Sequence, residues 1–92
     1  MSEQTIYMLQ EELAQDPDNP LLLLNLSAHL RRVGSIDASS RLLLRCARLY
    51  KDEGELERAA ACLQQLMRFD PEHTNALKLF RRISALSNPD KS

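Results

Sequence analysis

The stretch that decides the fold is residues 40–71, SRLLLRCARLYKDEGELERAAACLQQLMRFDP. On both sides of Gly54 the apolar residues recur at steps of three and four, which places them on one face of an α-helix. The apolar pattern stops around Gly54, and Asp70-Pro71 ends the second run. The stretch therefore predicts two helices joined by a turn so short that they must run antiparallel.

The same pattern continues toward both ends of the chain and predicts five helices. They run from about residue 3 to 14, from Pro20 to Gly34, from 36 to 51, from 55 to 69, and from just after Pro71 to about 87. Asn19 is placed to cap the second helix, because its side chain can accept from free backbone N–H groups. No run of alternating β-branched residues predicts a strand. The fold class is all-α, in one domain with an acidic helix at 1–16, helical repeats at 17–87 and a disordered tail at 88–92.

The periodicity also predicts which side chains face the core. Helix by helix they are Ile6, Leu9, Leu13 and, less centrally, Met8; Leu23, Leu26, Leu30 and Val33; Leu42, Leu43, Cys46, Leu49 and Tyr50; Leu56, Ala59, Ala60, Leu63, Leu66 and Met67; and Ala76, Leu77, Phe80, Ile83 and Leu86.

Composition excludes several classes of protein. Twelve basic and thirteen acidic side chains give a net charge of −1, which does not favour nucleic acid or membranes as partners. No apolar run approaches the ~20 residues of a membrane span, and the N-terminus lacks the pattern of a signal peptide, so a cytoplasmic chain is expected. Two glycines cannot form a phosphate-binding loop, and His29 and His73 stand apart from each other. We expect no enzyme, no cofactor and no metal, and we expect Cys46 and Cys62 to be free, buried thiols.

Around Gly54 the sequence resembles a tetratricopeptide repeat, a helix–turn–helix unit of about 34 residues. With Ser40 as the first position, the small or turn-forming residues fall where the repeat has them: Ala47 at position 8, Gly54 at 15, Ala59 at 20 and Pro71 at 32. Leu43 replaces the usual aromatic at position 4, and Cys46 the usual leucine at position 7. A second register starts at Pro20, only 20 residues upstream, so the third helix fits two units at once. The resemblance implies a short right-handed array of helical hairpins; an unrelated small helical bundle is the alternative.

The resemblance also implies a binding scaffold, because such arrays hold a peptide or a partner helix in a groove lined by the first helix of each unit. The residues that it places in this groove are Leu21, Leu24, Ala28 and Arg31 from the Pro20 register; Arg41, Leu44, Arg45, Arg48 and Lys51 from the Ser40 register; and Lys78 and Arg82 from the last helix. Residues 1–20 carry five acidic and no basic side chains, whereas residues 21–51 have a net charge of +5. The arginines suit the carboxylates of an acidic peptide, although an ordinary solvated face would look the same.

Several functions remain open. The main hypothesis is a protein-binding adaptor. A small secretion-type chaperone or a co-chaperone is an alternative of similar kind, although only part of the family's clamp for chaperone tails finds a match, in Asn25, Arg41 and Arg45. A structural subunit that forms a homodimer or larger homo-oligomer is another, since two and a half repeats bury little and the acidic first helix could bind a second copy. The four consecutive leucines at 21–24 favour an interface, because they surround the helix and leave Leu21 or Leu24 exposed. An RNA-binding helical repeat is the remaining rival.

Overall fold

The computed structural model describes the backbone of residues 2–87 and the side chains of residues 4–87. The predicted disordered tail at 88–92 lies outside the described residues. The described part is five helices: α1 (Ser2–Gln15), α2 (Pro20–Arg32), α3 (Ile36–Asp52), α4 (Leu56–Phe69) and α5 (Thr74–Ser87). It contains no strand, as predicted. No helix within residues 2–87 is long and apolar enough to cross a bilayer.

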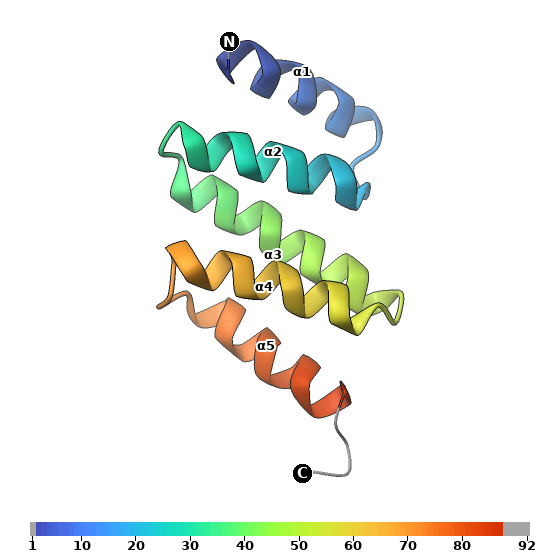
Figure 1. The fold of residues 1–92 in the computed structure, drawn as a ribbon. Coiled ribbons are helices and arrows are strands. Elements are labelled where there is room, and N and C mark those ends of the chain that lie inside the picture. The colour runs from blue at the N-terminus through green and yellow to red at the C-terminus, as the bar shows by residue number, and fades with distance from the viewer. Residues whose placement is uncertain (1, 88–92) are drawn as a thin grey trace.

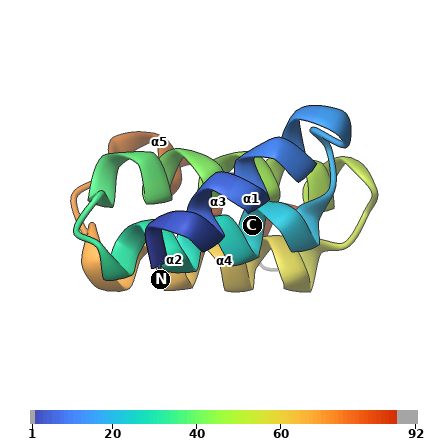
Figure 2. The ribbon, with the colours of Figure 1, turned by 90° about the horizontal axis from the view of Figure 1, so that it is seen from above.

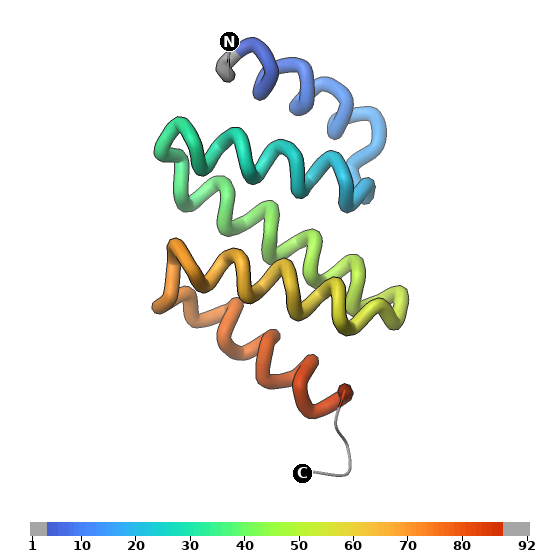
Figure 3. Tube along the Cα trace, in the orientation of Figure 1, coloured from blue at the N-terminus to red at the C-terminus, as the bar shows by residue number. Residues whose placement is uncertain are grey.

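The helices form an elongated array in which each packs mainly on its neighbours along the chain (Figure 1). The array measures 48 × 26 × 15 Å, and the chain reverses direction at each short turn (Figure 3). Seen along the array, α2 and α4 lie in one layer, α3 and α5 lie in the other, and α1 crosses obliquely over the end (Figure 2). The pairs α2–α3 and α3–α4 pack most extensively, whereas α1 packs on α2 and stands off from α3.

Two of the turns have the same construction. Gly34 and Gly54 have φ of 86° and 81°, a left-handed conformation that favours glycine. The residue after each glycine donates its N–H back into the preceding helix, Ser35 to Leu30 O at 2.8 Å and Glu55 to Tyr50 O at 2.8 Å. This pattern satisfies carbonyl groups that a helix end leaves free. The glycine spacing in the sequence therefore corresponds to two equivalent helix–turn–helix connections.

Polar side chains just before α2 and α5 accept hydrogen bonds from the first backbone N–H groups of these helices. The Asn19 side chain accepts from the backbone N–H groups of Leu21 at 3.0 Å and Leu22 at 3.4 Å, as predicted for a cap of α2. The last helix begins at Thr74, later than predicted, because residues 71–72 form a turn in which the His73 N–H donates to Asp70 O. His73 Nδ1 then accepts from Ala76 N at 3.2 Å at the start of α5.

The core lies along α3 and α4 and continues into α2 and α5. Its fully enclosed residues include the predicted leucines and small residues, Leu23, Leu43, Cys46, Ala47, Ala59, Leu63, Leu66 and Ile83. Three serines are also buried, and each has a partner: Ser39 Oγ donates to Ser27 O at 2.8 Å, Ser27 Oγ donates to Leu24 O at 2.9 Å, and Ser40 Oγ donates to Asp70 Oδ2 at 3.1 Å. The Ser39–Ser27 bond joins α3 to α2, where small side chains let the two helices approach closely. Among the described side chains, the buried Nδ1 of His29 in α2 has no hydrogen-bond partner.

Four side chains predicted for the core are exposed instead. Val33 follows the last turn of α2, so it leaves the helical face that the periodicity describes. Met8, Leu77 and Leu86 lie on the end helices α1 and α5, on sides that no further described helix covers. Conversely, Leu79 was not predicted for the core and is buried there.

Candidate partner-binding surface

An arginine stripe runs along the exposed side of α3, the central helix of the array. It consists of Arg41, Arg45 and Arg48, which are all exposed and are spaced by four and three residues. That spacing places them on one side of the helix, while the opposite side holds Leu43, Cys46, Ala47 and Tyr50 in the core. The burial of one side of α3 therefore fixes the direction in which the arginines point.

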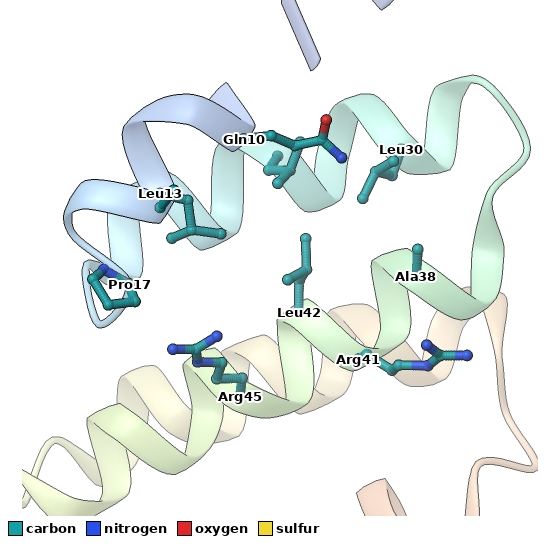
Figure 4. A pocket seen from close by; sticks show the side chains of 10 residues that line it. Gln10, Leu13, Pro17, Leu30, Ala38, Arg41, Leu42 and Arg45 are labelled. Carbon is teal, nitrogen blue, oxygen red and sulfur yellow. The ribbon is translucent and has the colours of Figure 1, made fainter. Parts of the chain in front are cut away.

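On one flank of the stripe, α1, α2 and α3 border an open apolar hollow of about 450 Å³. Figure 4 shows Leu13, Leu30 and Leu42 converging on it from three different helices, with Arg41 and Arg45 at its edge. The remaining lining residues are Gln10, Ala14, Pro17, Leu26 and Ala38. The hollow exists because α1 packs on α2 and leaves the side of α3 uncovered.

Arg45, on α3, forms an ion pair with the loop between α1 and α2 at the edge of this hollow. Its Nη2 lies 3.2 Å from Asp18 Oδ1, which belongs to the loop between α1 and α2. Both side chains are well exposed, so water screens the pair, and its contribution to stability is at most about 1 kcal/mol. A carboxylate of a partner can therefore compete with Asp18 for the guanidinium at little cost.

On the other flank of the stripe lies a basic cleft of about 290 Å³ between α3 and α5. Its lining carries four cationic side chains, Arg48, Lys51, Lys78 and Arg82, and one acidic one, Asp52. Lys51 Nζ is 3.7 Å from Asp52 Oδ1, which offsets part of the charge. Asn75 and Leu79 complete the lining. Like charges gathered in a concave site create a positive potential that favours an anionic group.

The structure brings some of the predicted partner-binding residues together and separates others. Arg41 and Arg45 meet at the apolar hollow, and Arg48, Lys51, Lys78 and Arg82 meet at the basic cleft. Leu44, which was predicted to face the groove, is buried in the core.

The four residues from the Pro20 register belong to α2, in the layer opposite α3 and α5. Leu21 is 66% exposed, which confirms the prediction that at least one of the four consecutive leucines is exposed. Ala28 is half-buried. Leu24 lines a separate small pocket next to Tyr50 and Cys62. The Arg31 guanidinium lies over the ring of Phe69, 5.0 Å from its centre.

The sequence did not predict that an apolar hollow lies between α1, α2 and α3. Leu13, Leu30 and Leu42 were assigned to the core, and each is in fact only half-buried. Their periodicity is that of any inward face, so it carries no sign that α1 stands off from α3. The glutamine and alanine on this side of α1, Gln10 and Ala14, are the weak signal that a large apolar partner is missing there.

The two cysteines lie in contact inside the α3–α4 pair. They are free and buried, as predicted, with their sulfurs 3.7 Å apart, and Cys46 Sγ is also 3.6 Å from Pro20 O. The hydrogen bond with Cys62 and the burial of the sulfur raise the pKa of Cys46. Within residues 4–87 no group of three His, Cys, Asp or Glu side chains is placed to hold a metal ion.

No model of a known protein family matches the sequence, and no curated protein matches it.

Proposed function

We propose that this chain is a non-enzymatic adaptor, which holds an acidic amphipathic helix or an acidic peptide along α3. The observation that carries the proposal is the position of the arginine stripe between an apolar hollow and a basic cleft. An amphipathic helix has an apolar side for the hollow and carboxylates for the guanidinium groups, which bind carboxylates in a planar, two-point geometry. A partner lying across the stripe can use the hollow and the cleft at once.

The proposal includes the resemblance to a tetratricopeptide repeat for α3 and α4. Ala47 and Ala59, at the two positions where the repeat has small residues, are completely buried in the α3–α4 pair. Gly54 takes the left-handed conformation in the turn between the helices. The starts of α1, α3 and α5 are 34 and 38 residues apart, close to the length of one repeat. In this reading α3 and α5 are first helices of consecutive units, which is the position that lines the groove in that family.

The test is capture of a partner by an immobilised chain and by two variants of equal charge. R41E/R45E/R48E reverses the stripe, whereas R32E/R58E/R68E reverses three exposed arginines of α2 and α4. Each charge-assisted hydrogen bond contributes about 1.5–3 kcal/mol, so loss of two or more is expected to weaken binding by at least about 100-fold. A specific partner should therefore be retained by the native chain and by the second variant and lost from the first.

Helical circular dichroism is expected to be the same for all three proteins, since the arginines concerned are exposed. Equal retention by the stripe variant, or equal loss from both variants, contradicts the assignment of the surface.

A further inference from the structure

The two end helices of the array expose faces of opposite charge. On α1 the side away from α2 carries Tyr7, Met8, Glu11 and Glu12, all of them exposed, the first two by 63% and 56%. No basic residue lies in Ser2–Gln15. This acidic end face thus combines two apolar side chains with two carboxylates.

The corresponding face of α5 carries positive charge. Lys78, Arg81 and Arg82 are exposed there together with Leu77, which is 36% exposed, and Lys78 and Arg82 also line the basic cleft. No acidic residue lies in Thr74–Ser87. The two faces have the same layout, because Glu11 and Glu12 follow Tyr7 and Met8 by four residues, and Arg81 and Arg82 follow Leu77 and Lys78 by four. Within the described side chains, 4–87, none of these five charged groups forms an ion pair.

One molecule cannot bring these two faces together. They lie on the first and last helices of an array 48 Å long, separated by α2, α3 and α4 (Figure 1). Each face leaves apolar side chains uncovered at the end of a stack, where helical-repeat arrays normally need a polar cap. In charge, each face complements the face at the other end of a second copy of the chain.

We propose that copies of this chain associate head to tail, with the acidic end face of α1 in one copy packed on the basic end face of α5 in the next. This proposal does not rest on the proposed adaptor function, although Lys78 and Arg82 belong both to the basic cleft and to this end face. The contact is heterologous, so it extends into chains of copies and does not close as a symmetric dimer. One helix face on another buries less than the roughly 1,600 Å² of a standard interface, so the association is weak, concentration-dependent and sensitive to salt.

The experiment is sedimentation equilibrium of the native chain and of charge-reversed variants at low and high salt. E11K/E12K makes both ends basic and R81E/R82E makes both ends acidic, so each variant alone is expected to associate at least about tenfold more weakly than the native chain. An equimolar mixture of the two variants restores opposite charges at every contact and is expected to regain the association.

Two further variants control for charge alone. E53K/E57K and R58E/R68E make the same changes at exposed positions away from both end faces and are expected to associate as the native chain does. A native mass of 10.5 kDa at every concentration up to about 1 mM in low salt overturns the proposal. Association that survives in the single variants, or a mixture that stays as weakly associated as its components, overturns it as well.

Discussion

The close approach of α3 and α4 depends on Ala59, and enlarging this residue tests the packing directly. Ala59 is completely buried, as is Ala47 on the facing helix. Ala59→Leu adds three carbon atoms where the core has no space for them, and overpacking of this kind costs about 1–3 kcal/mol. Ala61, two residues along the same helix, is exposed, so Ala61→Leu is a matched control with an expected change within about 0.5 kcal/mol.

The size of the effect on thermal unfolding follows from the length of the chain. For 92 residues the unfolding entropy near the midpoint is about 0.19 kcal/mol/K, so a loss of 1–3 kcal/mol lowers Tm by about 5–15 °C. Urea unfolding followed by circular dichroism gives the same free-energy difference at constant temperature. The reasoning is refuted when Ala59→Leu unfolds at the same urea concentration as Ala61→Leu, because the α3–α4 contact then has room for a large side chain.

Two further predictions concern a helix start and the buried thiols. Asn19→Ala removes the acceptor for two backbone N–H groups at the start of α2 and should lower the free energy of unfolding by about 1 kcal/mol; urea unfolding would contradict this by giving no change. The pKa of Cys46 is raised above its ordinary value of 9.0 in the folded chain, so on raising the pH the unfolded chain loses the thiol proton first. The free energy of unfolding should therefore fall as pH rises above about 9. The fall should be smaller in Cys46→Ala, and equal curves of unfolding free energy against pH for the two proteins would show that the thiol is not responsible.

Most of the fold could be predicted from the sequence, because the apolar periodicity, the turn residues and the helix cap all indicate the same helix boundaries. Apolar residues at steps of three and four, the two turn glycines and Asn19 locate five helices, which the structure confirms. Three of the four side chains wrongly predicted for the core lie on the end helices α1 and α5. Periodicity separates one face of a helix from the other, but it does not show whether a further helix covers that face, and for Met8, Leu77 and Leu86 none of the described helices does.

Of the candidate site, the sequence correctly predicted only the residues on α3 and α5. Counting from Ser40 placed Arg48, Lys51, Lys78 and Arg82 on one surface, and they line one cleft. Counting from Pro20 gave α3 the role of a second helix, so it assigned residues of α2 to the same surface, whereas α2 lies in the other layer. The sequence fits both registers because every helix of the array must bury an apolar face, and only the layer order distinguishes them.

The measurement that tests the central claim most directly is a nuclear magnetic resonance titration of the labelled chain with the partner that it captures, followed at leucine methyl and arginine Nε–H signals. The account predicts that the signals of Leu13, Leu42, Arg41, Arg45 and Arg48 shift together as the partner occupies the hollow and the stripe. Shifts confined to α2 and α4, at Leu21 or Arg68 for example, would place the partner on the opposite layer and contradict the account.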